Sequence, residues 1–309
     1  MRPRSRAARH AHVVATLSLL LFSCTSWQSG GNDAPLRVMT FNIRLNLASD
    51  AQNAWPHRKA AVASMIRFHG ADLVGLQEAL PEQLDDLAEL LPQFARVGVG
   101  RAADRTGEHS AILYRKERFD LLENDTFWLS ETPDVPGRKG WDAAYERIVT
   151  WAKLRDRRTG TILVHVNTHL DHLGVVARRE GTRLLLQRIA TIAGAGAGAP
   201  VVLTGDFNDV PDSDPYRLVT ASGLQDALVQ SRCPHHGPTS TWNGFREIEP
   251  GRRIDFIFVR GIGEVLQHAI LSDTFDGRFP SDHLPVLAEI RAGPAPRSGP
   301  GEPCPTTSR

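Results

Sequence analysis

Five short segments of this 309-residue sequence have the same layout: an apolar run ends in side chains that can bind a metal ion or transfer a proton. Asparagine, aspartate and glutamate supply oxygen ligands, which a hard cation such as Mg²⁺ prefers. Histidine can transfer a proton or hydrogen-bond a phosphate group. The segments are Thr40–Asn42, Leu76–Glu78, Asn167–Asp171, Gly205–Asn208 and Ser281–His283.

Hydrolysis of a phosphodiester brings together the functions that these side chains offer. A metal ion neutralises phosphate charge, a carboxylate orients or deprotonates water, and cationic or donor groups stabilise the charge on the leaving group. Each segment alone is a weak indication, because an Asp or Asn at a strand end is more often a turn or cap residue than a ligand. The prediction therefore depends on elements that gather all five segments.

Mixed strands and helices are predicted around these segments. Residues 36–42 alternate apolar and polar side chains as a half-buried strand does, and the folded domain starts there. A helix follows Trp55–Pro56 and ends at Gly70, and a buried strand at 72–76 completes a β-α-β beginning. Further strands are expected at 111–114, 119–129, 148–155, 161–168, 201–204, 254–259, 264–271 and 284–290, and further helices at 81–91 and 175–193. With no break in composition between residues 35 and 292, the pattern suggests one α/β domain.

Taken together and in order, the motifs resemble those of the endonuclease/exonuclease/phosphatase superfamily, in a bacterial exported branch. They are NxR after the first strand, QE after the second, then THLDH, GDFND, RIDF and SDHLPV, and they span residues 36–290. The resemblance implies a DNase I-like four-layer α/β sandwich, with two mixed sheets packed face to face and helices outside. It also implies a metal-dependent phosphoesterase that uses Mg²⁺, with Mn²⁺ as a possible substitute.

The same resemblance implies which residues hold the metal and the nucleophile. Asn42, Glu78 and Asp282 match the metal site, and Glu78 is its principal carboxylate. Asp206 matches the acid that orients or activates the attacking water. Asn208 matches the neighbour that holds the phosphate or the nucleophile.

The remaining matched positions are histidines and their partners. His283 matches the histidine that contacts the scissile phosphate, and Asp255 matches the carboxylate that pairs with it and favours its cationic form. His169 matches the second active-site histidine of nuclease and sphingomyelinase-like branches, which disfavours an enzyme for abasic DNA. Asp171 is expected either to support the His169 loop or to form a local turn. Arg147 is a candidate for substrate binding, because it can clamp a phosphate bidentately.

Other residues near the motifs are assigned to packing or to the surface. His165 lies on an alternating strand, and His235–His236 lie in a turn-rich insertion expected to be solvated. Trp128 and Trp151 are expected to pack in the core. A solvated helix face is expected for Arg178, Arg179, Arg183 and Arg188.

The ends of the chain differ from its centre. The first 23 residues have an Arg-rich start and an apolar run from Val13 to Phe22, about half the roughly 20 residues that span a bilayer, and they are typical of an export signal. Leu21–Cys24 resembles a bacterial lipoprotein cleavage box, so Cys24 either carries a lipid anchor or is unmodified. The expected division is an export signal at 1–23, a linker at 24–35, a catalytic domain at 36–292 and a disordered tail at 293–309.

Charge and cysteine content limit the function classes. The first 23 residues carry four arginines, which leaves 32 basic and 35 acidic residues in the rest, a net charge of −3. Affinity for nucleic acid comes largely from Lys and Arg against phosphates, so a duplex-DNA binder is disfavoured but not excluded. Cys24, Cys233 and Cys304 are too few for a disulfide framework and lack the close pairing of a zinc site. Because Cys304 lies in the tail, which has too little apolar content to order itself, no bridge to Cys233 is expected.

These observations predict an exported Mg²⁺-dependent phosphodiesterase or phosphatase that is secreted, periplasmic or a membrane-anchored lipoprotein. Its substrate is expected to be a phosphorylated small molecule, a lipid headgroup or a single-stranded nucleic acid. No obligate protein partner is indicated, and the membrane is reached only through the possible anchor at Cys24. The alternatives are an extracellular nuclease, which needs a contiguous basic and aromatic groove, and a binding module that kept the fold. The sequence gives the binding module no support, since every matched carboxylate and histidine is present.

Overall fold

The computed structural model describes residues 35–194, 198–292 and 304. The predicted export signal, the linker up to residue 34, the possible anchor at Cys24 and the tail apart from Cys304 lie outside the described residues. The described residues belong to one compact unit. Within the described ranges, no helix is long and apolar enough to cross a membrane.

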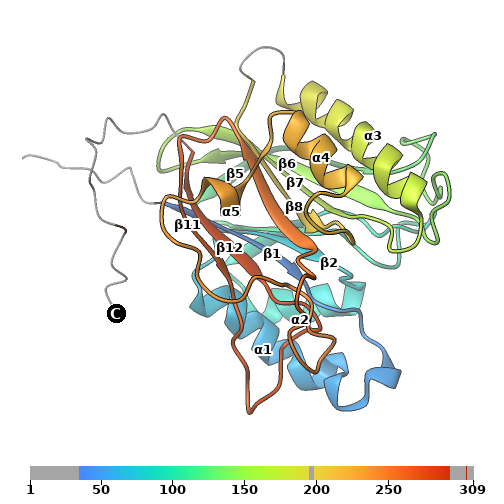
Figure 1. The fold of residues 1–309 in the computed structure, drawn as a ribbon, viewed down its shortest axis with the longest axis vertical. Coiled ribbons are helices and arrows are strands. Elements are labelled where there is room, and N and C mark those ends of the chain that lie inside the picture. Colours follow the sequence, from blue (N-terminus) through green and yellow to red (C-terminus); the bar gives the residue numbers. More distant parts are fainter. Residues whose placement is uncertain (1–34, 195–197, 293–303, 305–309) are drawn as a thin grey trace, which may run out of the picture. The chain divides into compact units, whose positions relative to one another are not determined.

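Two six-stranded mixed sheets make up the centre of this unit (Figure 1). In each sheet one central pair of neighbours is parallel, β1 with β2 and β7 with β8, and the other neighbours are antiparallel. The first sheet has the order β11 (Glu264–Ile270), β12 (Val286–Arg291), β1 (Leu36–Asn42), β2 (Leu73–Gln77), β4 (Ile112–Arg115) and β3 (Phe94–Val97). The second has the order β5 (Phe119–Trp128), β6 (Ile148–Asp156), β7 (Ile162–His169), β8 (Val201–Asp206), β10 (Asp255–Arg260) and β9 (Gln225–Asp226).

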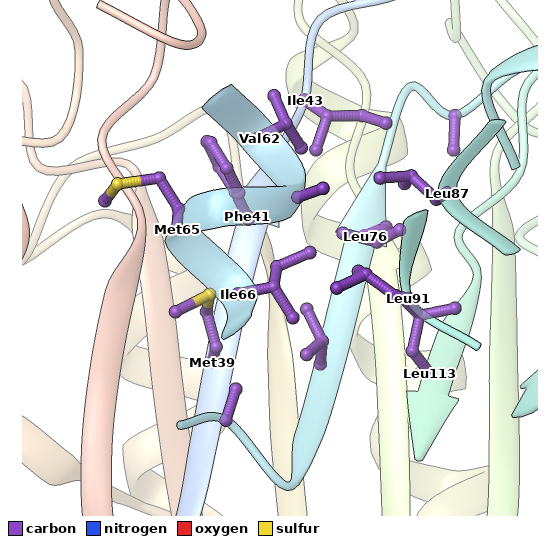
Figure 2. Close-up of a cluster of buried hydrophobic side chains, with 14 of the residues drawn as sticks. Met39, Phe41, Ile43, Val62, Met65, Ile66, Leu76, Leu87, Leu91 and Leu113 are labelled. Atoms are coloured by element: carbon purple, nitrogen blue, oxygen red, sulfur yellow. The ribbon is translucent and has the colours of Figure 1, made fainter. Parts of the chain in front are cut away.

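Helices cover the outer faces of the sheets. On the first sheet, Val62, Met65 and Ile66 of α1 pack against Met39 and Phe41 of β1 (Figure 2). A proline occupies the first turn of α1, α2 and α4, where its missing N–H leaves no hydrogen bond unmade. The helices are α1 (Trp55–Phe68) and α2 (Pro81–Leu90) on the first sheet, α3 (Val175–Ala193) and α4 (Asp214–Ala221) on the second, and the short α5 (Ala227–Gln230) and η1 (Ala48–Asn53). The fold is the four-layer α/β sandwich that the sequence predicted.

A buried polar seam joins the two sheets where they face each other. Nε2 of Gln77 on β2 donates to Oγ1 of Thr40 (3.0 Å) and to Oδ1 of Asn167 on β7 (2.7 Å). Oγ1 of Thr204 on β8 donates to the same Asn167 oxygen (3.0 Å). Gly75 lies against this seam, because a Cβ there would be 2.2 Å from Thr204 Oγ1 and 2.4 Å from Asn167 Oδ1. The apolar interface between the sheets is therefore interrupted by hydrogen bonds that fix their separation at this point.

The residues assigned to packing lie as predicted in the core or at its edge. His165 is fully buried with Nε2 2.9 Å from Thr204 Oγ1, and burial lowers its pKa to about 3, so it is a neutral structural residue. Trp128 is buried and its Nε1 donates to the carbonyl of Arg101 (2.7 Å). His236 is exposed, whereas His235 is half-buried with its ring 5.1 Å from that of His268.

The prediction that Cys233 stays unpaired is wrong. Cys233 and Cys304 form a disulfide, with their Cα atoms 5.6 Å apart. Cys233 is buried beside β11, where its N–H donates to the carbonyl of Leu266 (3.1 Å). The expectation rested on the apolar content of the tail, and one covalent bond at Cys304 does not depend on that content.

Candidate active site

The sheet topology brings the five chemistry-bearing segments to one edge. Parallel neighbours end at the same edge of a sheet, so Asn42 and Gln77 are register partners at the ends of β1 and β2, and His169 and Asp206 at the ends of β7 and β8. The antiparallel strand β10 begins at this edge, where Asp255 pairs in register with Asp206. Ser281–His283 lie just before β12, which runs antiparallel to β1 and therefore also begins there.

Three residues at these strand ends have a backbone that L-residues rarely adopt. The φ angles of Arg44, Glu78 and Asn208 are 54°, 60° and 48°. Each such position costs free energy of order 1–3 kcal/mol, and non-glycine residues in this region gather at functional sites. The left-handed turns redirect the chain immediately after the strands, which places the side chains of Glu78 and Asn208 in the site.

Asn42 joins carboxylates from the two sheets. Its Nδ2 donates to Oε1 of Glu78 and to Oδ2 of Asp206, both at 3.0 Å. The N–H of Arg44 donates to Oδ1 of Asn42 (3.0 Å), which fixes the orientation of the amide. One buried amide thus holds the predicted metal carboxylate and the predicted water-activating carboxylate in a fixed relation.

His283 and Asp255 form a buried hydrogen-bonded pair. Nδ1 of His283 lies 2.8 Å from Oδ2 of Asp255, and its Nε2 lies 3.7 Å from Oδ2 of Asp206. Burial by itself would lower the pKa of His283, but the carboxylates of Asp255 and Asp206 outweigh it and raise this pKa to about 10. His283 is therefore a cation at neutral pH, with its Nε2 side directed at the site. The edge of the Trp242 ring packs on it, with ring centroids 4.8 Å apart.

The pKa of Asp206 is raised, whereas the pKa of an exposed carboxylate in an ion pair is usually lowered. Burial, then the neighbouring Asp255 carboxylate, raise its pKa to about 7, although His283 acts against the rise. Oδ1 of Asp206 accepts the N–H of Asn208 (2.8 Å). A buried carboxylate with a pKa near neutrality can accept a proton from water and later release it.

His169 is kept neutral beside this carboxylate. Its Nε2 lies 3.5 Å from Oδ2 of Asp206 and 2.9 Å from Nδ2 of Asn208. Burial lowers the pKa of His169 well below its usual value, and the cations Arg147 and His283 lower it further. Nδ2 of Asn208 also donates to the carbonyl of Leu170 (3.0 Å), so it serves as a donor to His169, whose proton then lies on Nδ1.

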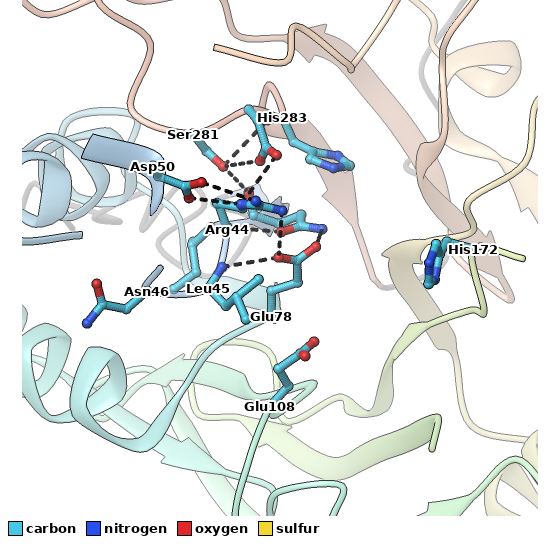
Figure 3. A network of polar contacts seen from close by, with 12 residues as sticks. Arg44, Leu45, Asn46, Asp50, Glu78, Glu108, His172, Ser281 and His283 are labelled. Carbon is cyan, nitrogen blue, oxygen red and sulfur yellow. Dashed lines mark hydrogen bonds and ion pairs between the residues drawn. The ribbon is translucent and has the colours of Figure 1, made fainter. Parts of the chain in front are cut away.

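The structure adds Arg44 to the site, a residue that received no role from the sequence although it is the Arg of the NxR motif. Its Nη1 lies 4.0 Å from Oε2 of Glu78, and its Nε lies 3.8 Å from Oδ2 of Asp282 and 3.1 Å from Asp50 (Figure 3). The N–H of Leu45 donates to Oε2 of Glu78 (3.1 Å). The motif was the available signal, but only the fold shows that the guanidinium lies among three carboxylates.

The donor set in this region fits a hard divalent cation. Glu78 and Asp282 are nearly buried and both face the guanidinium of Arg44. Asn42 would add its amide oxygen, which here accepts the N–H of Arg44. Burial raises the pKa of Asp282, the charge of His283 opposes the rise, and the charge of Glu78 adds to it. Among the described residues, Asp206, Asp255 and His283 form a second group with ligand atoms within 4.8 Å of one another, and Oδ1 of Asp255 is buried without a partner.

Arg147 and Asp171 lie at the border of the site. Nε of Arg147 donates to Oδ2 of Asp171 (3.2 Å), and its Nη2 lies 3.1 Å from Nδ1 of His172. Asp171 also accepts the backbone N–H of Gly174 (2.7 Å), a local turn contact, and of Ala144 (3.1 Å), a contact to another segment, so it combines the two roles that the sequence left open. Arg147 lines the same hollow as Glu78 and His169, and its role as a phosphate clamp stays a prediction.

Comparison with known proteins decides the family. The model of the Endonuclease/Exonuclease/phosphatase family matches residues 39–283, most of the chain. The chain belongs to this family. Like the other members, it is a hydrolase acting on phosphoester bonds, and the family is metal-dependent.

Two solved structures of family members resemble this one over most of its length. An endonuclease/exonuclease/phosphatase from Bacteroides vulgatus is 39% identical with a TM-score of 0.80, over 84% of this chain and 100% of that one. The mannosyl-6-phosphatase of Bacteroides thetaiotaomicron VPI-5482 is 37% identical with a TM-score of 0.78, over 82% of this chain and 99% of that one.

A more distant family member is the CCR4-Not complex 3'-5'-exoribonuclease subunit Ccr4 of Aspergillus niger, 24% identical over 56% of this chain and 33% of its own. The chain spans about half or less of the length of the curated relatives that it matches.

Proposed function

We propose that this protein is an exported, Mg²⁺-dependent phosphatase that releases phosphate from a small phosphorylated compound, with a phosphorylated sugar as the leading substrate class. The observation that carries the proposal is the complete site at one edge of the two sheets. It is supported by 37% identity to a mannosyl-6-phosphatase over 99% of that chain.

The side chains suggest how the ester bond is cleaved. Asp206 accepts a proton from the attacking water, whose oxygen forms a bond to phosphorus as the ester P–O bond breaks. Cationic His283, held by Asp255, stabilises negative charge on the phosphate oxygens. The leaving alkoxide takes up a proton from solvent, Asp206 later releases to solvent the proton it accepted, and the products are orthophosphate and the free alcohol. A bound Mg²⁺, held by Glu78, Asp282 and Asn42, would supply further neutralisation of phosphate charge.

The surroundings of the site favour a small substrate over a nucleic acid. The hollow at Glu78 and His169 is narrow, with a cavity volume of about 10 Å³, far below the roughly 300–1,000 Å³ of sites for drug-sized ligands. The four arginines of α3 do not form a free basic surface, since each contacts an acidic side chain. The pairs are Arg178–Asp209, Arg179–Glu180, Arg183–Glu180 and Arg188–Asp134. An extracellular nuclease remains the second candidate because of the similarity to Ccr4.

Export is supported by the first residues of the chain and by the disulfide, and the choice of Mg²⁺ by the donor atoms of the site. The Arg-rich start and apolar run of the first 23 residues support export, and the Cys233–Cys304 disulfide is typical of an oxidising compartment. The oxygen-only donor set of Asn42, Glu78 and Asp282 supports Mg²⁺ or Mn²⁺ rather than a thiolate-binding metal.

Replacing Glu78 by glutamine is expected to weaken metal binding. The change removes the principal charged ligand, so the Mg²⁺ concentration for half-maximal phosphate release should rise by at least about 10- to 100-fold. A magnesium titration of activity measures this shift, and the rise in melting temperature on adding Mg²⁺ should shrink in parallel. Glu123→Gln, in an exposed pair with Lys153, is the matched control. An unchanged magnesium requirement in Glu78→Gln would contradict the assignment.

A further inference from the structure

A group of polar and aromatic side chains without a role in the proposed reaction continues the hollow beyond Glu78 and His169. Arg101, Glu108 and Ser110 line it on the side of the segment 100–110. Figure 3 shows Glu108 on the same side of the site as Glu78, with His172 on a separate segment across from both. A substrate whose phosphate lies at Glu78 can reach this group with its alcohol part.

Backbone hydrogen bonds fix the position of this segment. The N–H of His109 donates to the carbonyl of Ala79 (2.8 Å), which places Glu108 next to the strand end that carries Glu78. Two backbone hydrogen bonds close the segment into a loop. The N–H of Arg101 donates to the carbonyl of Glu108 (3.0 Å), and the N–H of Gly100 donates to the carbonyl of Arg105 (2.9 Å). The side chains of Arg101 and Glu108 are therefore not needed to close the loop.

Arg101 and Glu108 nevertheless form a close and largely buried ion pair. Nη2 of Arg101 lies 2.5 Å from Oε1 of Glu108, and the side chains are only 17% and 13% exposed. Removing two charges from water costs free energy that their attraction does not reliably return. Beside a reaction site, such a pair can bind a hydroxyl group of a substrate, because it places a fixed acceptor and several fixed N–H donors side by side.

Tyr145 supplies an aromatic surface next to the pair. Its side chain is 49% exposed, and Cζ of Arg101 lies 4.8 Å from its ring centroid. The ring is stacked on that of His172, with centroids 5.8 Å apart and planes 19° apart, and Arg147 holds His172 through Nδ1. Tyr145 is thus held in a fixed orientation by Arg101 and His172, and the exposed part of its ring is available for apolar contact with a ligand at the mouth of the hollow.

The charges argue against a second phosphate in this position. The positive charge of Arg101 is balanced by the carboxylate of Glu108, and Glu146 adds another carboxylate to the lining of the hollow. A polynucleotide, or a headgroup with a further phosphate, would place its negative charge against these carboxylates. An uncharged ring with several hydroxyl groups meets no such repulsion.

We propose that Arg101, Glu108 and Tyr145 form a subsite for the alcohol part of the substrate and select a hexose phosphate. Glu108 and Arg101 bind ring hydroxyls, and the exposed part of the Tyr145 ring packs against the sugar. The proposal rests on the proposed phosphatase function for the phosphate end of the substrate.

The test compares mannose 6-phosphate with propyl phosphate, a primary alkyl ester that has neither ring nor hydroxyls. In Glu108→Gln, KM for mannose 6-phosphate should rise about tenfold or more, because a site built to bind hydroxyls loses an acceptor, while kcat changes little. In Tyr145→Ala the same KM should rise about three- to tenfold, and Tyr145→Phe should restore it. For propyl phosphate, the rise in KM should be several times smaller in each variant. Glu123→Gln is the matched control for Glu108→Gln.

Equilibrium binding separates this subsite from the phosphatase function. The Kd of mannose 6-phosphate, measured by calorimetry in EDTA, should weaken in Glu108→Gln and Tyr145→Ala in the same order as KM. If the affinities of the wild-type protein and the variants for mannose 6-phosphate follow this order but the wild-type protein cleaves neither ester, the phosphatase function is wrong and the subsite stands. If the wild-type protein cleaves both esters and KM rises equally for the two substrates in the variants, the subsite is wrong and the function stands.

Discussion

Replacing His283 by glutamine is expected to lower kcat for phosphate release by about 100- to 10,000-fold, the usual contribution of a positioned acid, base or charged donor. The reason is that a cation is lost where negative charge develops on the phosphate. Asp255→Asn should have an effect of similar size, because the carboxylate holds the ring at 2.8 Å and maintains its charge. The two residues act as one unit, so the double variant should be little worse than either single variant. Additive losses would contradict the pair.

The pH dependence of Asp255→Asn gives this prediction a second readout. The pKa of His283 is raised to about 10 by Asp255 and Asp206, so the wild-type protein keeps the cation throughout the neutral and mildly alkaline range. Removing the Asp255 charge lowers that pKa, and the alkaline limb of the kcat profile should move to lower pH. Asp120→Asn, in an exposed pair with Arg157, is the control and should leave the limb in place.

Gly75→Ala is expected to have the largest effect on stability. The added Cβ would meet Thr204 Oγ1 at 2.2 Å and Asn167 Oδ1 at 2.4 Å, and both belong to the seam between the sheets. The free energy of unfolding should fall by about 3 kcal/mol or more, since overpacking costs about 1–3 kcal/mol and a broken buried hydrogen bond about as much. Urea unfolding followed by circular dichroism measures the change.

Gly181→Ala is the matched control for Gly75→Ala. Gly181 is buried in α3, where a new Cβ would meet Leu129 Cδ1 at an ordinary 3.5 Å. Alanine also favours a helix over glycine by up to about 1 kcal/mol, so this variant should be as stable as the wild type or slightly more so. If Gly75→Ala unfolds at the same urea concentration as Gly181→Ala, the close approach of the sheets at Gly75 is not as described.

Long elements with clear periodicity were predictable from the sequence, and short ones were not. The helix at 175–193 was placed at its observed bounds, since an apolar pattern precedes Gly194. The four-residue strand β3 and the two-residue strand β9 are too short to show alternation. Helix α4 was missed although Ser213, which caps it, and Pro215 in its first turn are its standard start signals.

For the site, strand-end residues were predictable and loop contacts were not. Asn42 and Asp206 end strands, Glu78 directly follows one and His283 lies just before one, so the topology alone brings them together. The contact between Arg101 and Tyr145 joins two loops 44 positions apart in the numbering, and it depends on conformations that no residue pattern encodes.

The most direct test of the central claim is phosphate release from mannose 6-phosphate by the purified protein and by Asp206→Asn, each with Mg²⁺, with Mn²⁺ and with EDTA. Asparagine keeps the shape of the side chain but cannot accept a proton, so kcat should fall by at least about 100-fold while the protein stays folded. The account predicts turnover that needs the metal and is lost in Asp206→Asn. Turnover that persists in the folded variant, or that is unaffected by EDTA, would contradict it.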